Sequence, residues 1–167
     1  FASENFQGTS RAGLYGDVVE EIDWSVGTVL ETLKEIGADK NTIVIFSSDN
    51  GPWQNLPKRM LQQGNEEWHA GLSGHLRGSK ATTYEGGHRV PCIVRWPGRI
   101  PAGKTTAEMA TQMDVFPSVL NAVGSGIPGD RVIDGNDIIG MLQGKTPTPT
   151  QVFYYFRAYR LEAVRDG

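Results

Sequence analysis

Hydrophobic residues recur every three or four positions between residues 14 and 36, and charged residues mostly fill the places between them. The apolar positions are Leu14, Val18, Ile22, Val26, Val29, Leu33 and Ile36. This spacing predicts one long amphipathic helix. We expect Thr9 or Ser10 to cap its start, because short hydroxyl side chains accept backbone N–H bonds. Gly37 stands where a glycine that ends a helix belongs.

The next pattern is continuous rather than periodic, and it covers residues 41–52, NTIVIFSSDNGP. Residues 43–46 are β-branched or aromatic with no polar alternation, which predicts a strand covered on both faces in a parallel sheet. Asp49 and Asn50 then fall just past the carboxyl end of this strand, in a turn that Gly51 permits. Ligands bind at that edge in open α/β sheets. Helix, short loop and buried strand are half of a βαβ unit, so we predict the α/β class.

The rest of the chain predicts shorter elements. Residues 53–78 form a long connection without sustained periodicity, which marks a candidate active-site loop. The further elements, in chain order, are a strand at 92–96, a helix at 115–123, a helical turn at 137–142, and antiparallel strands at 152–156 and 160–164 joined by a tight turn at 157–159. Asp114 is expected to cap the helix at 115–123, and Gly124 is expected to end it.

Composition and charge exclude several classes of protein. The chain has 167 residues, a net charge of -3 and a hydrophobic fraction of 38%, which fits one globular core. It contains no block of Lys and Arg, so we expect no nucleic-acid partner. No apolar run approaches the ~20 residues that span a bilayer, so we expect no membrane partner. Because the chain opens on Phe1 rather than Met, we expect it to be cut from a longer protein.

Asp49 and Asn50 are the first candidates for chemistry. An adjacent carboxylate and amide can ligate a hard divalent cation such as Ca²⁺ or Mg²⁺. The same Asp-Asn-Gly triplet also forms ordinary turns for conformational reasons alone. The residues by themselves leave a metal site and a simple turn both open.

Three other reactive side chains have a structural interpretation. The single cysteine, Cys92, lies inside a predicted buried strand and is interpreted as a packing residue, because a free cysteine behaves as a small hydrophobe. Glu85 and Arg89 are expected to form an ion pair that shapes the turn at residues 86–87, since arginine readily pairs with carboxylates. Neither prediction gives these residues a chemical role.

Seven short motifs follow one another along the chain: GLYGD at 13–17, SDNG at 48–51, GSK at 78–80, YEGG at 84–87, RVP at 89–91, RWPG at 95–98 and MDVFP at 113–117. Together they resemble the sulfatase family of the alkaline phosphatase superfamily. The pattern is most like arylsulfatases and N-acetylgalactosamine-6-sulfatases. The resemblance implies that residues 1–150 are the C-terminal part of the catalytic core, an alkaline-phosphatase-like sandwich with a mainly parallel central sheet. Residues 151–167 would begin a small C-terminal antiparallel sheet.

The resemblance also implies roles for three residues. The family's acid and amide that match Asp49 and Asn50 help to coordinate an active-site cation, usually Ca²⁺, with Mg²⁺ as the alternative. The family's lysine that matches Lys80 contacts the substrate sulfate close to the leaving-group oxygen. An ammonium group suits this role, because it offers three donors and a full charge to the negative charge that develops there.

Histidine is well suited to protonate a leaving alkoxide near neutral pH. The resemblance, however, places the family's catalytic histidine upstream of Phe1, and not at His69, His75 or His88. We therefore keep His75 only as a candidate substrate-binding residue. Substrate specificity is expected to lie in variable loops such as residues 54–74.

The resemblance implies that the parent protein hydrolyses sulfate esters of a small molecule or a glycan through a formylglycine hydrate. That nucleophile is expected in the missing N-terminal half, so the chain alone is expected to be inactive and, with apolar faces uncovered, to self-associate. The family's location is exported or lysosome-like. Two alternatives stay open: a phosphate or phosphonate ester hydrolase of the same superfamily, and a non-catalytic module that binds glycans or packs on a partner.

Overall fold

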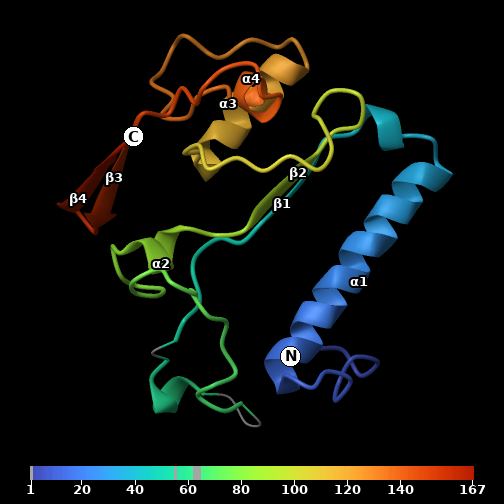
Figure 1. Ribbon diagram of the computed structural model, residues 1–167, viewed down its shortest axis with the longest axis vertical. Helices are drawn as coiled ribbons and strands as arrows, with labels where there is room; N and C mark the ends of the chain where they lie inside the picture. The colour runs from blue at the N-terminus through green and yellow to red at the C-terminus, as the bar shows by residue number, and fades with distance from the viewer. Residues whose placement is uncertain (1, 55, 62–64) are drawn as a thin grey trace. The chain divides into compact units, whose positions relative to one another are not determined.

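The computed structural model describes residues 2–54, 56–61 and 65–167, so the predicted loops at 53–78 and 54–74 lie partly outside the described residues. The chain divides into two compact units, Phe1–Ile93 and Val94–Gly167. Both units combine helices with strands, as the α/β prediction requires (Figure 1). The elements are α1 (Gly13–Glu35), η1 (Asp39–Asn41), β1 (Val44–Ser47), η2 (Lys58–Met60), α2 (Glu85–His88), β2 (Cys92–Arg95), η3 (Gln112–Asp114), α3 (Val115–Ala122), α4 (Ile139–Leu142), β3 (Val152–Arg157) and β4 (Arg160–Asp166).

Helix α1 confirms the prediction from periodicity, and it ends as predicted. Gly37 follows the C-cap residue Ile36 and has a φ of +72°, a left-handed conformation that favours glycine. The N–H groups of Gly37 and Ala38 bond back to carbonyl oxygens of the last helical turn at 3.1 and 2.9 Å. This pair of bonds is a Schellman motif, which satisfies carbonyls that the helix leaves open.

The start of α1 differs from the prediction. Ala12 is the N-cap residue and makes no side-chain cap bond, so neither Thr9 nor Ser10 caps the helix. The carboxylate of Asp17, a residue only 1% exposed, instead accepts the N–H groups of Gly8 and Ser10, each at 2.9 Å. The prediction of a hydroxyl cap was wrong because the preceding loop folds back over the first turn and bonds to a carboxylate within the helix.

These bonds make stability depend on pH. The N–H groups of Gly8 and Ser10 lower the pKa of Asp17, and burial opposes them. A depressed folded pKa stabilises the protein above the unfolded pKa, and this contribution is lost as pH falls through the folded pKa. We therefore expect the stability advantage of wild type over Asp17→Asn to shrink below about pH 4. Urea unfolding of the intact protein between pH 2 and 7 measures this difference, and a constant difference would contradict the expectation.

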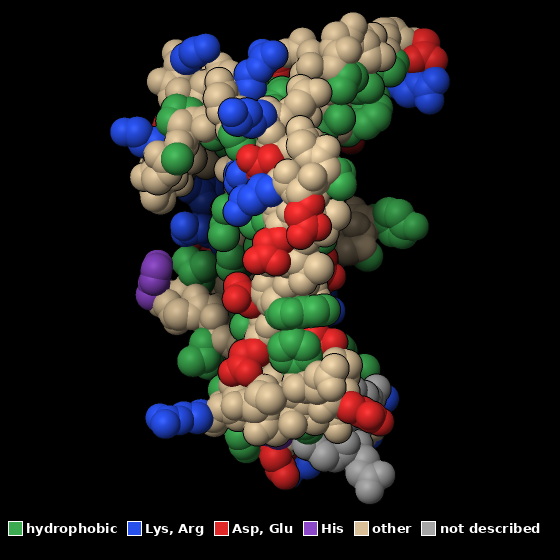
Figure 2. Space-filling view, turned by 90° about the vertical axis from the view of Figure 1, so that its right-hand side faces the viewer, with side chains coloured by type: hydrophobic (Ala, Val, Ile, Leu, Met, Phe, Trp, Pro, Cys, Tyr) green, Lys and Arg blue, Asp and Glu red, His purple; other side chains and the backbone are tan. Residues whose placement is uncertain are grey.

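The apolar side chains of α1 are only partly covered in the described structure. Only Gly16 and Asp17 of the helix are buried. Its exposed large apolar residues are Tyr15, Val19, Ile22, Trp24 and Val29. Figure 2 shows apolar and acidic side chains together on the surface of α1. None of the helices in the described ranges combines the length and the apolar character needed to cross a membrane.

Strands β1 and β2 pair in a two-stranded sheet, which confirms both strands to within one residue of their predicted bounds. Their burial was predicted wrongly. Val44 and Ile45 are half-buried, but Phe46 is 38% exposed and Cys92 is exposed. The reason is that the sheet has only two strands within the described residues, so few side chains cover its faces.

The second unit is organised around Asp114, whose side chain is fully buried at 0% exposure. Its carboxylate accepts the N–H groups of Thr111 at 2.6 Å and Asn136 at 2.8 Å, and lies 3.2 Å from the hydroxyl of Thr150. Asp114 thus completes a capping box on η3 and makes no side-chain cap bond to α3, so its predicted role was wrong. Gly124 ends α3 with a φ of +72°, as predicted.

The predicted C-terminal hairpin is confirmed. Strands β3 and β4 pair antiparallel from Val152 opposite Asp166 to Arg157 opposite Arg160, with a register shift between Tyr155 and Phe156. The tight turn between them holds Ala158 at a φ of +51°. The predicted domain boundary at residue 150 stays a prediction.

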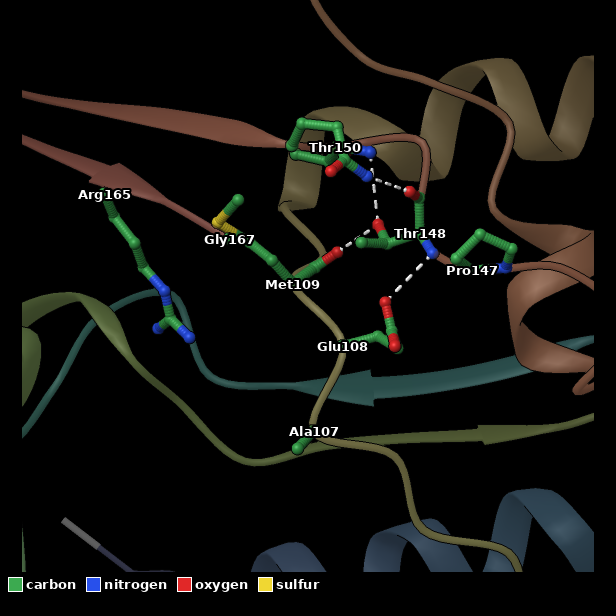
Figure 3. A pocket seen from close by; sticks show the side chains of 9 residues that line it. Ala107, Glu108, Met109, Pro147, Thr148, Thr150, Arg165 and Gly167 are labelled. Atoms are coloured by element: carbon green, nitrogen blue, oxygen red, sulfur yellow. Dashed lines mark hydrogen bonds between the residues drawn. The ribbon is translucent and has the colours of Figure 1, made fainter.

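A cavity of about 220 Å³ lies in the second unit, lined by residues of the segments 107–109 and 147–151 and by the end of β4 (Figure 3). Thr148 is bonded within this wall, because its N–H donates to Glu108 at 3.0 Å and its hydroxyl donates to the Met109 carbonyl at 2.5 Å. The lining contains no predicted site residue. The predicted site residues all lie in the first unit.

Candidate active site

The Asp49–Asn50–Gly51 turn follows β1 directly, as predicted. Asp49 is exposed, and its carboxylate has no hydrogen-bond or ion-pair partner in the described part of the chain. The Asn50 side-chain nitrogen donates to the Gly51 carbonyl at 2.9 Å. The Ser48 hydroxyl donates to the Asn50 carbonyl at 3.0 Å, which stabilises the turn. The oxygens of the Asp49 and Asn50 side chains are therefore available to a ligand.

These donors fit a hard cation in kind but not in number. Carboxylate and amide oxygens are the ligands that Ca²⁺ and Mg²⁺ prefer, and Ca²⁺ takes six to eight of them. Across residues 2–54, 56–61 and 65–167, no group of three or more His, Cys, Asp or Glu side chains could hold a metal ion. Asp49 and Asn50 can therefore supply only part of a coordination shell.

Lys80 is bonded to the same turn through the backbone. The Lys80 N–H donates to the Pro52 carbonyl at 2.9 Å, and the Gly51 N–H donates to the Gly87 carbonyl at 3.0 Å. The Lys80 ammonium lies 5.2 Å from the centroid of the Trp53 ring. The structure thus brings the loop that carries Lys80 to the segment that directly follows Asp49 and Asn50.

Three glycines allow this close backbone approach, and sequence reasoning missed that role. A Cβ on Gly51 would lie 1.8 Å from the Gly86 carbonyl oxygen. A Cβ on Gly86 would lie 2.2 Å from the Gly78 carbonyl oxygen, and one on Gly87 would lie 2.6 Å from the Ser79 carbonyl oxygen. All these contacts involve backbone atoms, so no side-chain rotation could relieve them. The signal in the sequence was the paired glycines, because glycine often marks such an approach.

The predicted Glu85–Arg89 ion pair is confirmed. The Arg89 guanidinium lies 3.1 Å from the Glu85 carboxylate across one turn of α2, and the two side chains are 51% and 38% exposed. Exposed pairs at this spacing contribute only about 0.5 kcal/mol. The pair therefore supports the short helix that contains Gly86 and Gly87.

Two of the three histidines lie in the connection at residues 53–78. His75 is exposed in the turn that the bond from the Leu76 N–H to the Ser73 carbonyl closes at 3.1 Å. His69 accepts the Glu66 N–H on Nδ1 at 3.0 Å, which leaves Nε2 to carry the proton of the neutral ring. The role of His75 in substrate binding stays a prediction.

The Cys92 thiol is poorly suited to act as a nucleophile. Although the residue is exposed overall, neighbouring atoms displace part of the water around its sulfur. This desolvation raises the pKa of the Cys92 thiol, and a hydrogen bond with Ser47 opposes the shift. A raised pKa leaves less of the reactive thiolate at neutral pH.

The fold and these contacts define a class of protein: an α/β protein with a carboxylate and an amide at a strand end and a lysine loop bonded to the same turn. The sulfatase family model matches residues 2–125, and this chain belongs to the sulfatase family.

The chain is 45% identical to the steryl-sulfatase of Mus musculus over 168 residues, which cover 99% of this chain and 26% of that protein. It is 42% identical to the N-acetylgalactosamine-6-sulfatase of Canis lupus familiaris, covering 100% of this chain and 30% of that protein. The crystal structure of the PsFucS1 sulfatase from Pseudoalteromonas sp. superposes with a TM-score of 0.83 at 30% identity, covering 98% of this chain and 31% of that chain. The α/β class and the alkaline-phosphatase-like fold are thereby confirmed. The chain spans less than a third of the length of these relatives.

Proposed function

We propose that the protein containing this chain hydrolyses sulfate esters, and that Asp49, Asn50 and Lys80 form part of its active site. The observation that supports this most is the pair of backbone bonds, Lys80 to Pro52 and Gly51 to Gly87, that joins the lysine loop to the Asp-Asn turn in a chain of the sulfatase family. In this proposal the nucleophile is a formylglycine hydrate that lies outside this chain.

Asp49 and Asn50 act in this proposal as ligands of a divalent cation, Ca²⁺ or Mg²⁺. Their oxygens are the donors that such cations prefer, and no side-chain oxygen of Asp49 or Asn50 accepts a hydrogen bond from the described residues. A bound cation polarises a substrate oxygen and offsets its charge. Further ligands come from the parts of the protein beyond this chain.

Lys80 acts as the stabiliser of developing negative charge. As the S–O bond stretches, charge gathers on the leaving oxygen, and a donor held in place beforehand binds that state better than it binds the substrate. Lys80 is half-buried, so bulk water screens its charge less than it would screen a fully exposed lysine. This residue therefore carries the largest catalytic contribution that we assign within the chain.

The substrate is proposed as a class only. Relatives named steryl-sulfatase and N-acetylgalactosamine-6-sulfatase match the chain almost equally well, at 45% and 42% identity. We therefore propose a sulfated small molecule or glycan without choosing between them. An exported or lysosome-like location stays part of the proposal.

Chelation tests the cation and the reaction together. We expect the full-length protein to hydrolyse p-nitrophenyl sulfate and to lose at least about 100-fold in kcat/KM after treatment with EDTA, because metal polarisation is worth several kcal/mol. Added Ca²⁺ or Mg²⁺ should restore the rate. The release of nitrophenol measures both effects.

The same assay, run with p-nitrophenyl phosphate and with the p-nitrophenyl ester of an alkylphosphonate, decides between the ester classes. Faster turnover of either substrate than of the sulfate would replace our proposal with the phosphate or phosphonate alternative. Binding of sulfated glycans without turnover of any ester would favour the non-catalytic module. Turnover that EDTA leaves unchanged would remove the role of Asp49 and Asn50 as metal ligands.

A further inference from the structure

Lys80 lies far from Pro52 and Trp53 in the sequence but contacts both residues in the fold. The Lys80 N–H donates to the carbonyl of Pro52, the residue before Trp53, at 2.9 Å. The Lys80 ammonium lies 5.2 Å from the centroid of the Trp53 ring. Both residues are half-buried. The lysine is therefore held at its main chain by Pro52 and at its charged end by the indole.

The contact with the indole is the one side-chain interaction that the Lys80 ammonium makes among the described residues. No carboxylate among them forms a salt bridge with Lys80. The face of a tryptophan ring attracts a cation within about 6 Å of its centroid, more strongly than the faces of other aromatic rings do. Such a contact leaves the full positive charge in place, whereas a paired carboxylate would offset it. The ammonium thus stays available to an incoming anion.

Holding the ammonium in place matters because lysine is flexible. Its side chain can adopt many rotamers, and an anion that orders it must meet the entropic cost. Contact with the indole restricts the side chain before any substrate arrives. Preorganised donors of this kind are more effective in catalysis than mobile ones.

We infer that Trp53 is a positioning residue for Lys80, which holds the ammonium ready for the oxyanion of a sulfate ester. This inference rests on the proposed function for the role of Lys80. It deepens that proposal, because it assigns a task to a residue of the long connection that no sequence motif identified.

A double-mutant cycle in the full-length protein tests the coupling. We expect Trp53→Leu to lower kcat for p-nitrophenyl sulfate about tenfold with a smaller change in KM, and Trp53→Phe to retain most of the activity because its ring still attracts cations. In a Lys80→Ala background, Trp53→Leu should have no further effect, because the ring then has nothing to position. Effects of Trp53→Leu that are equal in both backgrounds would overturn the inference.

Trp68→Leu is the matched control, since Trp68 is a tryptophan of the same connection that is 64% exposed and contacts His69 rather than a lysine. Its effect on kcat, whatever its size, should be the same with and without Lys80. If Trp68 were coupled to Lys80 as strongly as Trp53 is, any substitution in this connection would affect Lys80, and the inference would be overturned.

Binding of inorganic sulfate, measured by calorimetry, separates the inference from the proposed function. We expect Trp53→Leu to weaken sulfate binding only when Lys80 is present. If the protein hydrolyses no sulfate ester but keeps this coupled binding, the proposed function fails and the inference stands. If Lys80→Ala abolishes turnover while Trp53→Leu leaves both turnover and sulfate binding unchanged, the inference fails and the proposed function stands. A wild type that neither binds sulfate nor turns over an ester would overturn both.

Discussion

Replacing Lys80 by alanine in the full-length protein is expected to lower kcat for an aryl sulfate by about 10²- to 10³-fold, the usual cost of removing one donor to a developing oxyanion. The change in KM should be smaller, because the proposed contact strengthens as charge develops on the leaving oxygen. Steady-state kinetics with p-nitrophenyl sulfate measure both constants.

Two further substitutions sharpen this prediction. Lys80→Arg keeps the charge but replaces a compact ammonium with a planar fork, so we expect an intermediate rate. Lys104→Ala serves as a control, because Lys104 is an exposed lysine outside the candidate active-site loop at residues 53–78. It should retain the wild-type kcat. Loss of activity in Lys104→Ala equal to that in Lys80→Ala would contradict a specific role for Lys80.

Local signals were sufficient to predict the elements that place this site. The end of α1 at Gly37 depends on bonds within one helical turn, and the hairpin of β3 and β4 depends on strand pattern and a short turn. The Glu85–Arg89 pair likewise joins residues four positions apart. Each of these features is decided by neighbours in the sequence, so the sequence pattern contains its cause.

The features that were predicted wrongly depend on distant partners. Asp114 was expected to cap the helix that follows it, yet its carboxylate is shared with Asn136 and Thr150, the latter 36 positions away. Asp17 accepts bonds from a loop that folds back onto α1. A buried carboxylate is satisfied by whichever N–H groups the fold brings to it, and the identity of those groups cannot be deduced from the adjacent residues.

Burial was overestimated for a different reason. The apolar residues of α1 and β1 satisfy the periodic and continuous patterns of buried elements, yet Ile22, Val29 and Phe46 are exposed. A hydrophobic pattern indicates which face of an element is apolar, but it does not identify the residues that cover that face. Within the described residues few side chains cover these positions, and the chain spans less than a third of the length of the relatives it matches.

Gly86→Ala is the second substitution for which we expect a large effect. Its Cβ would lie 2.2 Å from the Gly78 carbonyl oxygen and 2.7 Å from the Arg77 carbonyl oxygen. Both are backbone atoms, so the loop that leads to Lys80 must move. A displacement of about 1 Å at a reacting group costs on the order of 10² in rate. We therefore expect kcat for p-nitrophenyl sulfate to fall about 100-fold, with a destabilisation of about 1 to 3 kcal/mol.

Gly129→Ala provides the comparison, because a Cβ on Gly129 would meet no atom within 4 Å and its backbone is not in the left-handed region. It should leave both kcat and the free energy of unfolding unchanged. Kinetics at a temperature where all variants are folded separate the two effects of Gly86→Ala, since a loss of stability alone would leave kcat per folded molecule unchanged. A folded Gly86→Ala variant with wild-type kcat would show that the position of Lys80 does not depend on the glycine contacts, and the site would then need a different physical basis.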